Sequence, residues 1–189
     1  MVIKYFIEYL TYNINNRFTW TKDIPLGVHD KRHSKGGGIM VWGILFPNGL
    51  ISLKVVNGWL KGDDYLEIVK FHAVPLMKMN INHPINFIHD NCTIHKVQSV
   101  RECLKVNNIH EINWPSRSPD LNIMENAWKM LSDIVYHDGQ PESLQILKER
   151  ILRAETIINT EKRNIIKNLY STFRKRLVYV LNKKGSVYK

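Results

Sequence analysis

The apolar pattern of the sequence changes its period near Gly58, and this change limits the folds open to the chain. Beyond it, apolar residues recur at helical spacing over residues 63–77. Before it, short runs rich in β-branched and aromatic residues alternate with turn signals, and they predict strands at residues 3–13, 17–21, 39–46 and 50–56. The first part of the chain is therefore expected to form an antiparallel meander.

Strands and helices alternate in the next part of the sequence. The pattern predicts a buried strand at residues 85–89, a helix at 96–106 and a short strand at 111–114. Residues 119–136 predict a further helix, with Ser118 at the N-cap and Pro119 in the first turn. A meander followed by such units predicts the α/β class, with a mixed sheet flanked by helices.

The last quarter of the sequence is amphipathic and basic. Residues 141–181 predict two helices that break near Asn159. We expect a core at residues 1–140 and basic C-terminal helices at 141–189 packed on the same domain. The apolar residues expected to cover the sheet are Leu147, Ile151, Ile157, Ile158, Ile165, Ile166 and Leu169.

Composition excludes several classes of protein. No apolar run is long enough to predict a membrane span, and the first residues have no signal-peptide pattern. The two cysteines, Cys92 and Cys103, lack CxxC spacing, which argues against a disulfide framework or a cysteine zinc site. A reducing compartment fits these features best.

The positive charge is concentrated at the C-terminal end. The net charge is +10, and residues 148–189 hold 12 Lys and Arg against 3 Asp and Glu, whereas residues 1–147 hold 15 against 14. Clustered cations favour a polyanion, because each phosphate that they neutralise releases counterions. A solvated helix face is the alternative interpretation. The candidate nucleic-acid contacts are Lys162, Arg163, Lys167, Arg174, Lys175 and Arg176.

Asp90 directly follows an apolar strand in the run INFIHDN. The carboxyl edge of an open α/β sheet is where ligands gather, so an Asp at this place is a candidate metal ligand. The alternative is that Asp90 only caps the turn into the following helix.

Glu125 is the second candidate carboxylate. It is expected in the second turn of the helix SPDLNIMENAW, near the positive end of the helix dipole. It lies beside a predicted buried stripe formed by Leu121, Met124, Trp128, Leu131 and Val135. A solvated glutamate on a helix is again the alternative.

The two carboxylates and their surroundings form a specific pattern. Between Asp90 and Glu125 lie 34 residues, with IHDNCTIH around the first and WPSRSPDLN before the second. These segments, with the upstream GGGIMVWG, resemble the catalytic domain of Tc/mariner DDE transposases over about residues 5–140. The family motif is D-N-x-x-x-H followed by S-P-D-L-N-P-I-E-N-x-W. This chain has Ile123-Met124 where the family has Pro-Ile.

The resemblance implies a ribonuclease-H-like fold with Asp90 and Glu125 as catalytic metal ligands. It implies two Mg²⁺ or Mn²⁺ ions, which prefer oxygen ligands and support in-line displacement at phosphorus. His95 matches the histidine of the motif and is expected near the site, although a local hydrogen-bonding role fits it equally well. DNA is the implied partner, with transposon ends and target as its forms; the resemblance further implies a nuclear location and a homodimer.

The family's first Asp has no identical counterpart in this chain. Aligning Phe6-Ile7-Glu8-Tyr9 with the family motif places Glu8 at that position, which gives a triad of Glu8, Asp90 and Glu125. Glutamate binds the same ions, but its extra methylene moves the carboxylate by on the order of 1 Å, and such a shift can cost about a hundredfold in rate. Asp23 and Asp30 are the alternatives, and both fall in a turn-rich stretch.

Three functions follow from these observations. The first is a metal-dependent DNA transposase or endonuclease catalytic domain without the N-terminal helix-turn-helix modules of the family. The second is a catalytically inactive descendant that binds nucleic acid or a protein through the basic C-terminal helices. The third is a generic nuclease of the same fold, which is less specific than the SPDLNIMENAW motif.

Overall fold

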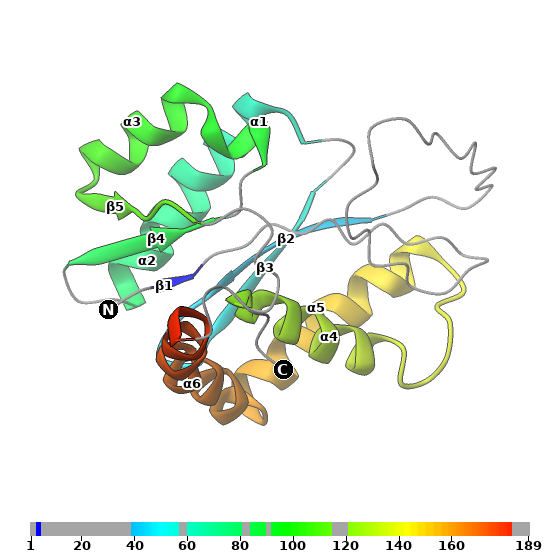
Figure 1. The fold of residues 1–189 in the computed structure, drawn as a ribbon. Coiled ribbons are helices and arrows are strands. Elements are labelled where there is room, and N and C mark those ends of the chain that lie inside the picture. The colour runs from blue at the N-terminus through cyan, green and yellow to red at the C-terminus, as the bar shows by residue number, and fades with distance from the viewer. Residues whose placement is uncertain are drawn as a thin grey trace, which may run out of the picture.

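Strands from distant parts of the sequence lie side by side in the centre of the fold (Figure 1). The structure is a computed structural model, and it describes residues 3–4, 39–56, 60–80, 84–89, 92–114 and 121–182. Three strands are parallel and hydrogen-bonded in the order β1-β4-β5. Their bounds are Ile3–Lys4 for β1, Ile85–Ile88 for β4 and Ile109–Glu111 for β5.

An antiparallel hairpin forms the other part of the strand layer. It consists of β2 (Met40–Leu45) and β3 (Ile51–Val56), with Met40 paired to Val56 and Leu45 to Ile51. At the turn, Gly49 has a φ of 88°, which a glycine adopts without strain. Strand β1 contacts β2 as well as pairing with β4, so the strands lie in the order β3, β2, β1, β4, β5.

Strand β2 is buried on both faces, and this burial explains the layered fold. Met40, Trp42 and Ile44 belong to one apolar core, whereas Val41 and Leu45 belong to a second core on the opposite face. Side chains alternate along a strand, so helices must cover both faces. The predicted α/β class, with a mixed set of strands between helices, is confirmed.

The first helical layer contains α1 (Gly62–Ile68), a π-helical turn (Val69–Ala73) and α2 (Val74–Asn80). In the π turn the N–H of Val74 donates to the carbonyl of Val69. The next residue, Pro75, has no N–H to donate, and the wider turn relieves the clash that proline causes within an α-helix. A 3-10 turn (Thr93–Lys96) and α3 (Gln98–Val106) complete this half.

The second helical layer contains α4 (Ile123–Val135), α5 (Leu144–Thr160) and α6 (Arg163–Asn182). The predicted break near Asn159 is confirmed. Helix α4 crosses β2 at Gly43, where an added Cβ would lie 2.8 Å from the indole ring of Trp128. A glycine at this position therefore allows α4 to pack closely on the hairpin.

Helix α5 covers the outer edge of β3. The side-chain amide of Asn159 accepts from the N–H of Ile51 at 2.8 Å and donates to the carbonyl of the same residue at 2.9 Å. One turn earlier, the carboxyl of Glu155 accepts from the N–H of Leu53 at 3.2 Å. These contacts satisfy backbone groups that an edge strand would otherwise expose.

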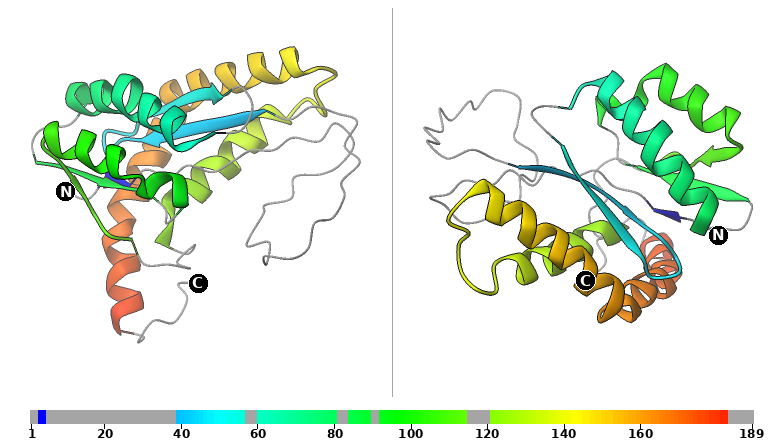
Figure 2. Two further views of the ribbon diagram at one scale, coloured as in Figure 1. Left: turned by 90° about the horizontal axis from the view of Figure 1, so that it is seen from above. Right: turned by 180° about the vertical axis from the view of Figure 1, so that it is seen from behind.

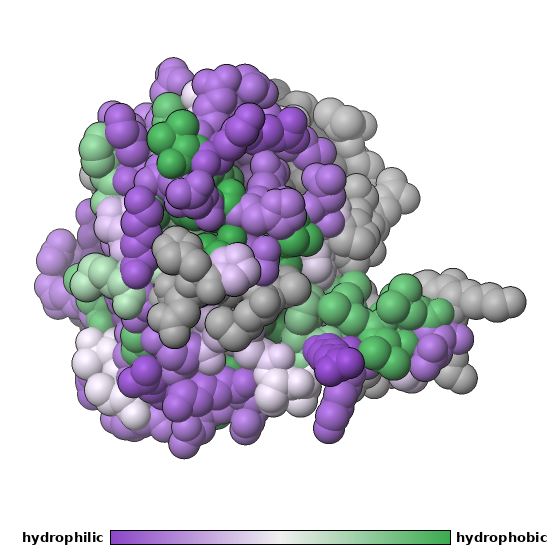
Figure 3. Space-filling model, turned by 90° about the vertical axis from the view of Figure 1, so that its left-hand side faces the viewer, coloured by the Kyte–Doolittle hydropathy of each residue, from purple (hydrophilic) through white to green (hydrophobic). Residues whose placement is uncertain are grey.

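Helix α6 extends beyond the strand layer. Figure 2 shows from above that its C-terminal half runs away from the strands. The exposed apolar residues Val178 and Leu181 lie in this projecting part, with 46% and 76% of their surface accessible. Figure 3 shows hydrophobic side chains gathered beside hydrophilic ones on the projecting part of the molecule. Within the described residues, no helix is long and apolar enough to cross a membrane.

Several predicted boundaries were wrong. Asn122, not Ser118, caps α4, because its side chain accepts from the N–H of Met124 at 2.9 Å. The last short strand lies at Ile109–Glu111 rather than at 111–114, since it begins as soon as α3 has ended and pairs with β4. Ile165 is 48% exposed instead of covering the strands. The predicted strand at 17–21 and most of that at 3–13 lie outside the described residues.

Candidate catalytic edge and basic groove

The end of β4 and the start of α4 share one buried core. Ile88, the last residue of β4, belongs to the same apolar cluster as Ile123 and Met124 in the first turn of α4. Strands β1 and β4 are parallel, so their carboxyl ends lie at the same edge of the strand layer. The strand end before Asp90 and the helix start that contains Glu125 therefore pack on the same apolar core.

Glu125 lies in the first turn of α4, one turn earlier than predicted. The shift follows from the cap at Asn122, which places Glu125 as the third residue of the helix. Its side chain is half-buried, between the buried residues Met124 and Ala127 and the exposed Asn126. A carboxylate at this place is stabilised by the positive end of the helix dipole. The predicted buried stripe of α4 is confirmed at Leu121, Met124, Trp128, Leu131 and Val135.

Asp90 and Glu8 lie outside the described residues, so the convergence of the three carboxylates stays a prediction. The alternatives Asp23 and Asp30 also lie outside. Within the described part of the chain, no three His, Cys, Asp or Glu side chains are grouped in a way that could hold a metal ion. Of the predicted triad, the structure places Glu125 alone.

A buried polar network adjoins the end of β4, and it was not predicted from the sequence. His89 follows β4 directly and contacts Tyr65 of α1 and Glu111 of β5. His95 is fully buried in the 3-10 turn, and its ring stacks on that of His89 with centroids 5.2 Å apart. The signal in the sequence was a histidine within the otherwise apolar run INFIHDN.

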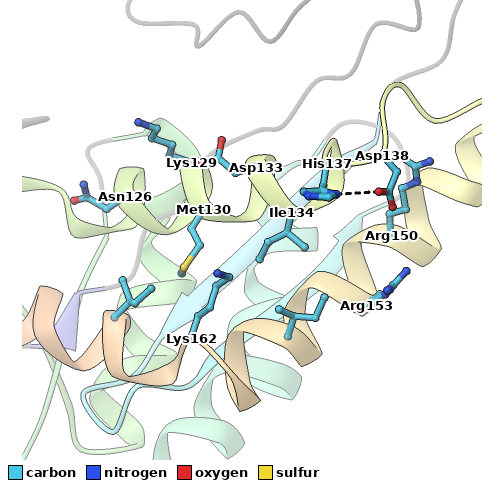
Figure 4. Close-up of a pocket in the computed structure, with 12 residues that line it drawn as sticks. Asn126, Lys129, Met130, Asp133, Ile134, His137, Asp138, Arg150, Arg153 and Lys162 are labelled. Carbon is cyan, nitrogen blue, oxygen red and sulfur yellow. Dashed lines mark hydrogen bonds and ion pairs between the residues drawn. The ribbon is translucent and has the colours of Figure 1, made fainter.

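A groove of about 540 Å³ runs along α4 and the facing sides of α5 and α6. In Figure 4, Met130 and Ile134 point from α4 toward the side chain of Lys162 across the groove. The groove is lined by four cations, Lys129, Arg150, Arg153 and Lys162, against two acids, Asp133 and Asp138. Its lining begins at Asn126, next to Glu125 in the sequence.

The charged residues of the groove differ in their intramolecular contacts. Arg150 donates to the carbonyls of Val135 and Gly139, at 3.1 and 2.7 Å, and so caps the C-terminal end of α4. A hydrogen bond from His137 lowers the pKa of the Asp138 carboxyl, with smaller contributions from Arg150 and Arg153. Lys129, Arg153 and Lys162 have no carboxylate within ion-pair distance among the residues that the structure describes.

The predicted nucleic-acid contacts at Lys162 and along α6 fall into two groups. The guanidinium of Arg163 donates to the carbonyl of Asn48 at 2.8 Å, and that of Arg176 donates to the side chain of Asn126 at 3.2 Å. These two arginines bind α6 to the hairpin turn and to α4. The remaining candidates are Lys167, Arg174 and Lys175, which are exposed, and Lys162, which lines the groove.

Comparison with known proteins agrees with this geometry. The model of the DDE superfamily endonuclease family matches residues 31–148, a range that contains Asp90 and Glu125 and begins after Glu8. The chain is 30% identical over 160 residues to the transposable element Tc3 transposase of Caenorhabditis elegans, which covers 84% of this chain and 48% of that protein. The chain thus spans about half the length of this curated relative.

Solved structures show the same fold. The Mos1 mariner paired end complex with Mn has a TM-score of 0.73 at 13% identity and covers 100% of this chain and 56% of that chain. The catalytic domain of Mos1 mariner transposase has a TM-score of 0.65 at 14% identity, with 80% and 76% covered. The fold is therefore ribonuclease-H-like. The chain belongs to the DDE superfamily endonuclease family, in its Tc/mariner branch of transposases.

Proposed function

We propose that the protein is a transposase catalytic domain that cleaves phosphodiesters of DNA and transfers strands with divalent metal ions. The observation that carries this proposal is the family match across residues 31–148, together with the shared core of the β4 end and the α4 start. Since the chain spans about half the length of its curated relative, the activity of the whole relative comes to this chain only as part of the proposal.

The proposed metal ligands are Asp90, Glu125 and Glu8. All three are carboxylates, and hard oxygen donors suit Mg²⁺ and Mn²⁺. Two such ions would supply activation of the attacking oxygen and stabilisation of the leaving oxygen. The chain itself would hold one carboxylate at the end of β4 and one at the start of α4. The Mos1 complex with Mn supports a divalent ion in this fold.

DNA is the proposed partner, and the cations of the groove and of α6 are its proposed contacts. Lys129, Arg153 and Lys162 line the groove, and Lys167, Arg174 and Lys175 are exposed on α6. Cations without intramolecular carboxylate partners remain available to phosphates. A nuclear location and association of two copies are also proposed, and both rest on the resemblance.

Nicking of supercoiled plasmid with Mn²⁺ or Mg²⁺ tests the proposed activity without a known recognition sequence. Asp90→Asn and Glu125→Gln should each lower the rate by at least about a hundredfold, because the charge that holds the ion is removed while the shape is kept. Glu102→Gln, at an exposed position of α3 outside the groove, is the matched control and should cut like the wild type. Unchanged nicking by Asp90→Asn would contradict the assignment of Asp90 as a metal ligand.

The Glu8 position motivates a second candidate function. If its longer side chain misplaces the carboxylate, the protein is an inactive descendant that still binds DNA. Calorimetry with Mn²⁺ separates the two candidates, since an inactive site without ions shows no binding that depends on Asp90 and Glu125. A gain of nicking rate in Glu8→Asp, with DNA affinity unchanged, would assign the inactivity to this one residue.

A further inference from the structure

His89 lies in a chain of hydrogen bonds that crosses the end of β4. The hydroxyl of Tyr65 lies 3.2 Å from Nδ1 of His89, and Nε2 of His89 lies 2.9 Å from Oε1 of Glu111. The other oxygen of Glu111 lies 3.6 Å from Nε of Arg101. This row of contacts thus links α1, the residue that follows β4, strand β5 and helix α3.

One arrangement of protons that fits these hydrogen-bond distances has His89 neutral. A neutral imidazole with its proton on Nε2 donates to Glu111 and accepts on Nδ1 from the hydroxyl of Tyr65. Glu111 then keeps its second oxygen toward Arg101. Each buried donor and acceptor in the row has a partner, as the low accessibility of His89 (4%) and Tyr65 (0%) requires.

Ring packing restricts the same imidazole from other directions. His95 stacks on His89 at an interplanar angle of 12°, and Phe87 lies with its ring centroid 5.0 Å away. Tyr65 also contacts His95, with centroids 4.5 Å apart. An imidazole that is enclosed and hydrogen-bonded at both nitrogens has one available rotamer.

Because His89 directly precedes Asp90 in the sequence, restricting the His89 side chain affects the proposed metal site. The pairing of β4 with β5 ends with the bond from Ile112 N–H to the carbonyl of Phe87, at 2.8 Å. His89 comes two residues after Phe87, and its side chain continues the link to β5 through Glu111. Consecutive Cα atoms are about 3.8 Å apart, so fixing His89 limits the placement of the residue that follows.

We propose that His89, held between Tyr65 and Glu111, is a positioning residue that fixes the backbone after β4, directly before Asp90 in the sequence. The proposal rests on the proposed function, in which Asp90 holds a divalent ion. His89 is only 4% exposed, so the role assigned to it is to orient Asp90 rather than to bind the ion itself. Outer groups that orient a metal ligand commonly change metal affinity by about 10- to 100-fold, which sets the scale of the expected effect.

Calorimetric binding of Mn²⁺ to the full chain tests this role in four variants. Tyr65→Phe removes the hydrogen bond to Nδ1 of His89, and Glu111→Leu removes the hydrogen bond to Nε2. Each variant should raise the Mn²⁺ dissociation constant on the order of tenfold. Glu111→Gln keeps an acceptor for the Nε2 proton and should bind Mn²⁺ nearly as the wild type does. Glu102→Leu is the matched control on exposed α3, where Glu102 accepts from Gln98.

Hydrogen exchange of the metal-free protein provides a readout that does not need the ion. In Tyr65→Phe and Glu111→Leu, the amides of residues 88–92 should exchange faster, whereas those of β2 should keep their wild-type rates. A purely structural role would lower protection across the whole fold and would not distinguish Glu111→Gln from Glu111→Leu in Mn²⁺ affinity.

The outcomes separate the two proposals. If Asp90→Asn abolishes Mn²⁺ binding while Tyr65→Phe and Glu111→Leu bind like the wild type, the positioning role is overturned and the function stands. Unchanged exchange at residues 88–92 also overturns the positioning role. If Asp90→Asn binds Mn²⁺ like the wild type, the proposed function fails, and the role of His89 toward Asp90 fails with it.

Discussion

The half-buried carboxyl of Glu155 makes the stability of the fold depend on pH. Burial of this α5 side chain against β3 raises its pKa above the usual glutamate value, although hydrogen bonds from Leu53 and Ser52 act in the opposite direction. The native state therefore holds the proton more tightly than the unfolded chain does. Stability falls as pH rises from the unfolded pKa through the folded one, and the penalty is complete above the folded pKa.

Glu155→Gln should stabilise the protein at neutral pH. The amide removes the cost of burying a charge and keeps an acceptor for the N–H of Leu53. We expect a gain in free energy of unfolding of a few tenths of a kcal/mol to about 1 kcal/mol at pH 7, which disappears below about pH 4. Urea denaturation at both pH values measures it. Glu142→Gln, at an exposed position, is the control, and a decrease in stability at pH 7 in Glu155→Gln would contradict the argument.

Single residues also show what the sequence could predict about the site. Glu125 was placed near a helix start because SPDLNIMENAW combines a helical stripe with a specific motif. The error of one turn arose because Ser118, Asp120 and Asn122 are all acceptable caps, and the hydrogen bond of Asn122 decides among them. The partners of His89 could not be predicted, because Tyr65 and Glu111 come from separate elements that meet only in the fold.

At the scale of elements, α5 packs along the outer edge of β3 and pairs with its backbone groups. Asn159 makes two hydrogen bonds to the backbone of Ile51, one through each end of its amide. These bonds are half-buried, so water replaces them only in part. Removing the side chain leaves a backbone donor and a backbone acceptor of β3 without protein partners.

Asn159→Ala should therefore lower the free energy of unfolding by about 1 to 3 kcal/mol. The change is measured from denaturant unfolding curves at constant pH. Asn168→Ala makes the same chemical change on the exposed face of α6 and should shift stability by no more than about 0.5 kcal/mol. Equal decreases in the two variants would mean that the edge contacts contribute nothing beyond helix propensity.

The longer strands were predicted well from the sequence, whereas the π turn and the shortest strand were not. The strands at 39–46 and 50–56 were expected from their composition, and β2 and β3 lie within those ranges. The π turn before Pro75 was not expected, since the sequence there has an ordinary helical pattern. Strand β5 is three residues long and exists because β4 is beside it, so sequence alone placed it too late.

At the scale of the whole molecule, the second helical layer carries the cations that line the groove and those exposed on α6. The C-terminal helices do two tasks, because Ile151, Ile158 and Ile166 fill the core while cations on other faces remain exposed. The excess of positive charge in this part was clear from the sequence. The groove formed with α4 was not, because Lys129 lies outside the basic stretch and joins it only in the folded protein.

The salt dependence of DNA binding tests whether the groove binds phosphates. Deleting residues 148–189 is unsuitable, since it would remove core residues, so charge-neutralising substitutions are preferred. The triple variant Lys129→Gln, Arg153→Gln, Lys162→Gln should bind duplex DNA of arbitrary sequence more weakly. The slope of log K against log salt should become shallower by about 0.9 for each phosphate that the protein no longer neutralises, or roughly 2 to 3 in total.

A charge-matched control separates local phosphate binding from a general effect of net charge. Lys54→Gln, Lys70→Gln and Lys105→Gln remove three exposed lysines from β3 and the first helical layer, outside the groove. Both triple variants remove the same charge, so long-range attraction weakens equally, but only the groove variant should release fewer counterions on binding. Identical slopes for the two variants would remove the groove from the DNA-binding surface and leave Lys167, Arg174 and Lys175 of α6 as the remaining candidates.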